Sequence, residues 1–171
     1  MKVGFAKCDY NDNGEILLFD KALKLSKQTY NSAKDRATTE KEIKALKAKG
    51  INCLCPEYPQ PKWFYALCDT LGIYVIDCAA LASPSSADNR DINGTPSNDP
   101  LLVEEYLMRV EAMYRRAQNH VSIIAFSLGS AETGNGYNLY KAYELLKSYG
   151  DSRAIIFEGA AGEWNTDLIN E

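Results

Sequence analysis

The strongest candidate for a chemical role is Glu132, the single acid in a glycine-rich segment that follows a short apolar run. The run 123–126 (I-I-A-F) leads into S-L-G-S-A-E-T-G-N-G, and a short apolar run bounded by glycines is typical of a parallel strand covered on both faces. A carboxylate just beyond the C-terminal end of such a strand lies where α/β barrels place their catalytic groups. The segment therefore predicts a reactive carboxylate at one edge of a parallel sheet.

Other reactive side chains have simpler explanations. Asp77 ends an apolar run and is expected to be a hydrogen-bonded strand-end acid, whereas Trp164 lies in the late loop G-E-W-N, where an indole could stack on a ring. Cys53 and Cys55 are two apart in a strand-like run, so they face the same way at roughly 6–7 Å. With one histidine and no C-x-x-C pair, we expect reduced thiols, no metal site and no cofactor.

The elements that would position these groups alternate along the chain. A β-hairpin is predicted over 2–19, with N-D-N-G at its turn, and an extended segment over 22–30. Thr39 and Glu42 have capping-box spacing for a helix that ends at Gly50. Further strands are predicted over 51–55, 73–77, 123–128 and 154–157, further helices over 62–71, 100–118 and 139–149, and a polar loop over 82–98.

Strand-helix alternation of this kind predicts a parallel sheet with right-handed crossovers. An open doubly wound sheet and a (β/α)8 barrel both fit, and periodicity does not separate them. The 171 residues, 46% of them hydrophobic, suffice for a sizeable core. The net charge is −4 and the basic residues form no concentrated patch, which argues against nucleic acid as a partner. We expect a soluble chain, because no apolar run reaches the roughly 20 residues of a membrane span and residues 1–10 lack a signal-peptide core; the compartment remains unknown.

The order of motifs favours the barrel. V-G-F-A-K-C and N-G-E-I-L-L-F-D-K-A-L-K-L come first, then F-Y-A-L-C-D-T-L-G-I-Y-V-I-D, then R-R-A-Q-N-H before I-I-A-F-S-L-G, and finally D-S-R-A-I-I-F-E-G. In this order the segments resemble glycoside hydrolase family 2, the β-galactosidase and β-glucuronidase family. The resemblance implies a partial TIM-type (β/α)8 barrel of about five parallel strands with flanking helices over residues 21–171. It also implies that residues 1–20 are a hairpin at the tail of a preceding β-sandwich.

The resemblance also assigns candidate site residues. Aligned from downstream, Glu132 matches the family's acid/base; aligned from upstream, the catalytic Asn-Glu pair falls on Ser130 and Ala131. The first-strand polar positions fall near Thr29 and Asn31. Glu57 stands in place of a histidine and Glu158 matches a glutamate near the sugar pocket, so a carbohydrate ligand is expected to contact Glu132, Glu158, Trp164, Glu57 and Asn31.

Several positions at which the family places side chains that hydrogen-bond sugar hydroxyls have other residues in this sequence. Cys55 replaces an arginine, while Cys78 and Ala80 replace a carboxylate and an amide. The family's nucleophile belongs to a seventh strand, and this sequence reaches about the start of the sixth. A retaining glycosidase needs two carboxyl groups. We therefore expect a fragment or degenerate member that is inactive as this chain, or alternatively a non-catalytic carbohydrate-binding or assembly domain.

A five-stranded partial barrel would have two edges. The late edge, residues 154–157, is apolar and is expected to expose unpaired backbone groups without protection. The early edge, residues 22–30, carries Lys24 and Lys27, whose charges protect it in part. The inner face of the sheet would also be open. Either the N-terminal hairpin covers that face or two chains pair through it, and we predict the homodimer.

Overall fold

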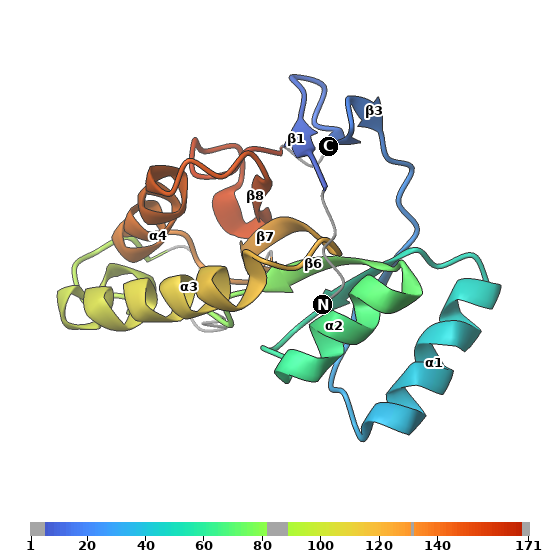
Figure 1. The fold of residues 1–171 in the computed structure, drawn as a ribbon. Helices are drawn as coiled ribbons and strands as arrows, with labels where there is room; N and C mark the ends of the chain where they lie inside the picture. Colours follow the sequence, from blue (N-terminus) through green and yellow to red (C-terminus); the bar gives the residue numbers. More distant parts are fainter. Residues whose placement is uncertain (1–5, 82–88, 131, 169–171) are drawn as a thin grey trace.

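The computed structural model describes residues 6–81, 89–130 and 132–168. It contains a large parallel sheet with helices along one side and a small antiparallel sheet beside one end (Figure 1). The small sheet has the order β1-β2-β3, formed by Cys8–Tyr10, Ile16–Leu18 and Lys21–Ala22. The predicted hairpin is thus confirmed from Cys8 onward, while residues 2–5 lie outside the described part.

The large sheet has five parallel strands in the order β4-β5-β6-β7-β8. Neighbours in sequence are neighbours in the sheet, which is the strand order of a barrel and not that of a doubly wound sheet. The predicted fold, a partial α/β barrel, is confirmed. The strands are Lys27–Tyr30, Cys53–Pro56, Tyr74–Cys78, Ile123–Gly129 and Ala154–Phe157. The extended segment predicted over 22–30 is two strands, because β3 pairs with β2 and β4 pairs with β5.

Four helices pack on the outer face of this sheet: α1 (Arg36–Ala48), α2 (Lys62–Leu71), α3 (Val103–Ala117) and α4 (Tyr137–Ser148). The 3-10 turns Pro96–Asn98 and Pro100–Leu102 precede α3, and Glu158–Ala160 follows β8. The predicted capping box of α1 is wrong. Asp35 is the N-cap and accepts from the Thr38 N–H at 3.0 Å, whereas Thr39 is fully buried and accepts from the Lys34 N–H.

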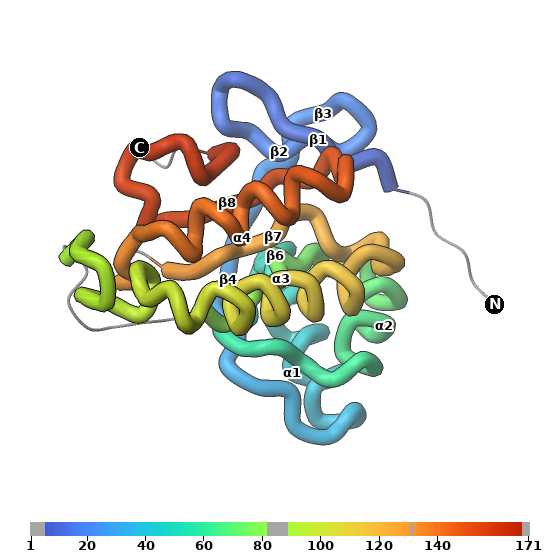
Figure 2. Tube along the Cα trace, turned by 90° about the vertical axis from the view of Figure 1, so that its left-hand side faces the viewer, coloured from blue at the N-terminus to red at the C-terminus, as the bar shows by residue number. Residues whose placement is uncertain are grey.

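The core has two parts because successive strand residues point to opposite faces. Leu54, Val75 and Phe126 belong to the outer cluster, against the helices. The inner cluster contains Cys53 and Ile124 together with Cys8 and Ile16 of the small sheet, plus Ile76, Ala125, Ala154, Ile156 and Leu168. The small sheet therefore covers the amino-terminal part of the inner face, and Figure 2 shows it above β8 and the end of α4.

The segment that follows β8 returns along its free edge. The Asp167 carboxylate accepts from the Ile155 N–H at 2.8 Å, and the Thr166 hydroxyl accepts from the Phe157 N–H at 3.0 Å. The Asp167 N–H in turn donates to the Ile155 carbonyl at 2.8 Å. The expectation of an unguarded late edge is therefore wrong, because backbone groups of β8 that a further strand would engage already have partners. Within the described residues, no helix is long and apolar enough to cross a membrane.

Candidate functional site

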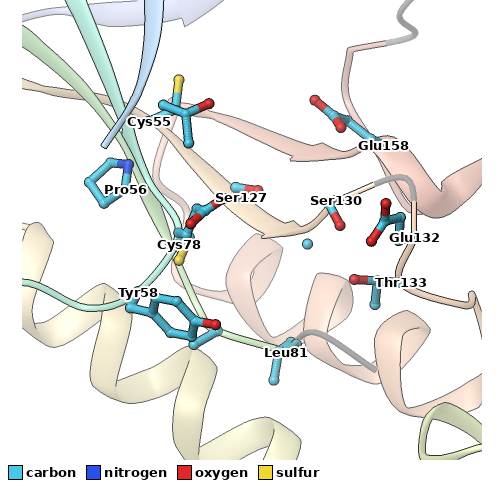
Figure 3. A pocket seen from close by; sticks show the side chains of 14 residues that line it. Cys55, Pro56, Tyr58, Cys78, Leu81, Ser127, Ser130, Glu132, Thr133 and Glu158 are labelled. Carbon is cyan, nitrogen blue, oxygen red and sulfur yellow. The ribbon is translucent and has the colours of Figure 1, made fainter. Parts of the chain in front are cut away.

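A cavity of about 450 Å³ lies at the carboxyl ends of the five parallel strands (Figure 3). Its walls come from β4, β5, β6 and β7 and from the segments that follow β5, β6, β7 and β8. This is the end of a (β/α) barrel that carries the active site. The lining residues are Thr29, Cys55, Pro56, Glu57, Tyr58, Cys78, Ala80, Leu81, Ser127, Gly129, Ser130, Glu132, Thr133 and Glu158.

Glu132 is placed by a tightly packed loop between β7 and α4. The Thr133 N–H donates to the Ser130 carbonyl at 3.0 Å, closing a turn around Glu132. The buried amides of Asn135 and Asn165 donate to each other at 3.0 and 2.8 Å, which ties the loop to the segment after β8. Glu132 itself is exposed at the cavity. The hydrogen bonds anchor the loop, and the anchored loop presents the Glu132 carboxylate to the cavity.

Glu158 approaches the same cavity from the end of the neighbouring strand. It begins the 3-10 turn Glu158–Ala160 directly after β8, and Figure 3 shows its side chain and that of Glu132 on the same side of the cavity. Glu57 lines the cavity from the segment after β5, where its N–H donates to the Tyr30 carbonyl at 3.2 Å. Three of the predicted site residues are thus brought together around one cavity.

The other two predicted site residues lie elsewhere. Asn31 is exposed, and its carbonyl accepts from the Gln60 amide at 3.3 Å; on this strand Thr29 lines the cavity instead. The Trp164 indole stacks on Tyr140, with ring centroids 5.2 Å apart, and meets Tyr143 edge-on at 5.7 Å. Trp164 is therefore packed on α4, with 55% of its surface exposed. Their roles in ligand binding stay predictions.

The cavity also contains residues that sequence reasoning passed over. Tyr58 is a cavity-lining aromatic with 61% of its surface exposed. An exposed aromatic in the segment after a strand was the available signal, since it directly follows Glu57 in P-E-Y-P. Ser127 and Gly129 also line the cavity, because residues two apart on β7 point to the same face of the sheet.

Two clusters of charged side chains lie near the strands that form the cavity but do not line it. Asp77 is fully buried; it accepts from the Tyr65 hydroxyl at 2.8 Å and from the Arg116 guanidinium at 2.9 Å. His120 Nδ1 lies 2.6 Å from the Asp69 carboxylate, whose other oxygen accepts from the Ser122 N–H at 2.9 Å. The first arrangement joins α2 and α3 to β6, as expected of a hydrogen-bonded strand-end acid at Asp77, and the second joins α2 to the segment before β7.

The arrangement suits a polar organic ligand. Carboxylates, hydroxyls and one exposed aromatic ring surround a cavity whose volume falls in the usual range for small-molecule sites, about 300–1,000 Å³. Across the described ranges, no group of three or more histidine, cysteine, aspartate or glutamate side chains has a geometry that could hold a metal ion. The fold and the position of the cavity define a (β/α)-barrel domain with its site at the carboxyl edge of the sheet.

Comparison with known proteins identifies the family. Residues 27–171 match the TIM barrel domain of glycosyl hydrolases family 2. The chain belongs to this family. It is 32% identical over 175 residues to β-galactosidase 2 of Enterobacter cloacae and 33% identical over 177 residues to the β-galactosidase of Alteromonas mediterranea. Each match covers 98% of this chain and 16% of the relative, so the chain spans about one sixth of the length of these relatives.

Solved structures show the same fold. The β-D-glucuronidase of Dictyoglomus thermophilum aligns over 92% of this chain and 29% of its own, with a TM-score of 0.76 and 20% identity. The β-glucuronidase of Ruminococcus gnavus in complex with D-glucaro 1,5-lactone aligns over 95% and 29%, with a TM-score of 0.72 and 18% identity.

Proposed function

We propose that the cavity at the carboxyl edge of the sheet binds a sugar, and that the polypeptide of residues 1–171 binds it without hydrolysing it. One observation carries the proposal: Glu57, Glu132 and Glu158 line one cavity of about 450 Å³ at the strand ends. Carboxylates accept hydrogen bonds from sugar hydroxyls, and the exposed ring of Tyr58 offers an apolar surface for a sugar face. The curated relatives are β-galactosidases, which favours a hexose or hexuronic acid as the ligand.

The composition of the cavity argues against efficient hydrolysis by this polypeptide. Cys55, Cys78 and Ala80 line it, and these side chains hold sugar hydroxyls poorly compared with charged or amide groups. Glu132 is exposed, and within the described residues no hydrogen bond to its carboxylate fixes its orientation. A catalytic carboxylate has to be held to within about 0.5 Å. The scaffold therefore supports binding better than it supports turnover.

We expect no release of chromophore from aryl β-galactosides or β-glucuronides by purified residues 1–171. Glycosidases accelerate hydrolysis by many orders of magnitude, so even a severely impaired enzyme would give a signal above the buffer rate. Glu132→Gln serves as the control for a contaminating glycosidase. Turnover that is present in the wild type and disappears in Glu132→Gln would contradict this prediction.

We expect binding of galactose or glucuronate to depend on Glu158 and Tyr58. Loss of one hydrogen bond or one stacking surface costs about 1–1.5 kcal/mol, or roughly a tenfold weaker affinity. NMR titration of 15N-labelled wild type, Glu158→Gln and Tyr58→Ala measures it. Tyr137→Ala is the matched control: it also removes an exposed aromatic, but one that does not line the cavity. Shift changes confined to the amino-terminal ends of the strands, or equal affinities for all variants, would reject the proposed site.

Assembly is the second candidate function. Strand β4 is the edge strand of the large sheet and, within the described residues, pairs with β5 alone. Its residues Lys27, Gln28 and Thr29 are exposed. These exposed residues favour a partner at that edge. The homodimer is predicted on the ground that the inner face of the sheet would be open, and the small sheet covers part of that face. Pairing of two chains stays a prediction, and the exposed edge of β4 is the feature that still supports it.

A further inference from the structure

The charged side chains in the wall of the cavity all have the same sign. Glu57, Glu132 and Glu158 reach the cavity from the segments that follow β5, β7 and β8, and no lysine, arginine or histidine is among the described residues that line it. The two thiols of the lining, Cys55 and Cys78, add only negative charge when they ionise. The lining therefore contains no group that would pair with an anionic ligand.

Two cationic side chains belong to residues close to the cavity wall, yet neither of them lines the cavity. Lys27 is exposed on β4, two residues before Thr29. Arg116 donates to the Cys78 carbonyl at 3.4 Å and forms an ion pair with the buried Asp77 carboxylate at 2.9 Å. The charge of Arg116 is thus balanced by a carboxylate outside the cavity, and the three glutamates determine the charge inside it.

An exposed aromatic ring faces the same space. Tyr58 lines the cavity with 61% of its surface exposed. Figure 3 shows Tyr58 across the cavity from Glu132 and Glu158, so a ligand between them meets carboxylates on one side and the ring on the other. The face of an aromatic ring attracts cations, as carboxylates do. Both kinds of group therefore favour a ligand with a positive charge.

A buried hydroxyl independently marks the cavity as a binding site. Thr133 lines the cavity and is 1% exposed, and its hydroxyl has no hydrogen-bond partner in the part of the chain that the structure describes. Figure 3 shows this hydroxyl below the Glu132 carboxylate and turned towards the interior of the cavity. Buried hydroxyls are normally paired, so that of Thr133 is available to a polar group of a ligand.

We propose that the ligand of this cavity is an amino sugar, bound with its protonated amine among the glutamates and Tyr58. The inference rests on the sugar-binding function proposed above and narrows the class of sugar. An ammonium group supplies three N–H donors to carboxylates that only accept, and such charge-assisted hydrogen bonds are stronger than those of a neutral hydroxyl. A hexuronic acid would instead add a fourth carboxylate to three of the same charge, which is unfavourable.

The test compares three sugars that differ in single substituents: galactose, galactosamine and galacturonate. NMR titration of the 15N-labelled wild-type chain at pH 6, where the sugar amine is protonated, measures each affinity. In about 20 mM NaCl, galactosamine is expected to bind about tenfold more tightly than galactose, and galacturonate at least about threefold more weakly. In about 0.5 M NaCl, the preference for galactosamine should fall to about twofold, because salt screens the partly exposed carboxylates.

Glu57→Gln tests whether the preference comes from the cavity. The substitution keeps the size of the side chain and removes its charge, and it is expected to lower the ratio of galactosamine to galactose affinity by about threefold. Asp12→Asn is the matched control. It also removes one negative charge, from an exposed position in the turn of the β1-β2 hairpin outside the cavity lining, and should leave the ratio unchanged.

The outcomes separate this inference from the proposed function. If galactose binds but galactosamine binds no more tightly, or if galacturonate binds more tightly than galactose, the amino-sugar inference is overturned and sugar binding stands. Equal effects of Glu57→Gln and Asp12→Asn would also overturn it, because the attraction would then come from the acidic chain as a whole. Absence of binding by all three sugars would reject both proposals. The comparison of sugars on the wild-type chain does not depend on whether a variant folds.

Discussion

Arg116→Leu is expected to lower the free energy of unfolding by about 3–5 kcal/mol, because it leaves a buried carboxylate without its counter-charge. Asp77 is fully buried on β6, and Arg116 on α3 is its cationic partner at 2.9 Å. The Arg116 Nε also donates to the Tyr65 hydroxyl at 3.0 Å. Urea denaturation at pH 7, followed by circular dichroism, measures the loss.

The loss should shrink as the pH is lowered. Burial raises the pKa of Asp77 above its ordinary value, and the charge of Arg116 opposes that rise. Removing Arg116 therefore raises the pKa of Asp77 further. A carboxyl group whose folded-state pKa is raised favours the folded state when protonated, and this stability is lost as the pH rises through the folded-state pKa. The difference between wild type and variant should accordingly be smaller at pH 5 than at pH 7.

Arg115→Leu is the matched control. It removes a neighbouring arginine of the same helix, whose ion pair with Glu111 is at the surface, with 71% of the Arg115 side chain exposed. Exposed pairs contribute roughly 0–1 kcal/mol. Equal losses in the two variants, or a loss for Arg116→Leu that does not change with pH, would show that helix propensity and not the buried charge explains the effect.

Gly159→Ala is expected to cost about 1–3 kcal/mol and to move the loop that carries Glu132. A Cβ at position 159 would lie 2.2 Å from the Thr133 carbonyl oxygen and 2.7 Å from the Phe157 ring. A backbone oxygen and a buried ring cannot rotate away as a flexible side chain does. The loop or the 3-10 turn must therefore shift, and the sugar response expected of this cavity should weaken with it. Urea denaturation and the amide shifts of Glu132 and Thr133 report the two effects.

Gly162→Ala separates this steric effect from the general cost of replacing a glycine. Gly162 has no atom within 4 Å of the added Cβ, and its φ of +85° makes alanine unfavourable by about 1 kcal/mol through backbone conformation alone. It should leave the amide shifts of Glu132 and Thr133 unchanged. If Gly159→Ala also leaves them unchanged, the contact between position 159 and Thr133 does not position the loop.

The strands and helices of the sheet were predictable because their apolar periods and glycine stops are local signals. Helix α2 and strand β8 begin and end at the residues that the pattern indicates. The start of α1 was not predictable in this way. Both Asp35 and Thr39 are acceptable caps by type, and Thr39 is instead fully buried inside the helix. Its burial is a tertiary effect that the local sequence does not indicate.

The site was predictable in part for the same reason. Glu57, Glu132 and Glu158 follow strands, and parallel strands bring their carboxyl ends together whatever the details of packing. Trp164 shows the limit of this reasoning. Its loop follows a strand as well, yet the indole packs on Tyr140 of α4, a contact between segments whose relative positions the sequence pattern does not encode.

The small antiparallel sheet has a consequence for the order in which the chain folds. The Ser152 hydroxyl donates to the Cys8 carbonyl at 2.5 Å, and the Lys147 ammonium donates to the Tyr10 hydroxyl at 2.9 Å. These contacts join residues 144 and 137 positions apart, and contacts of such long sequence separation form slowly. During synthesis the β1-β2 hairpin leaves the ribosome before α4 and the turn before β8, so these two contacts cannot form until both segments have emerged. Until then the hairpin is not fixed at that end of the sheet, and apolar residues of the inner face are more open to aggregation.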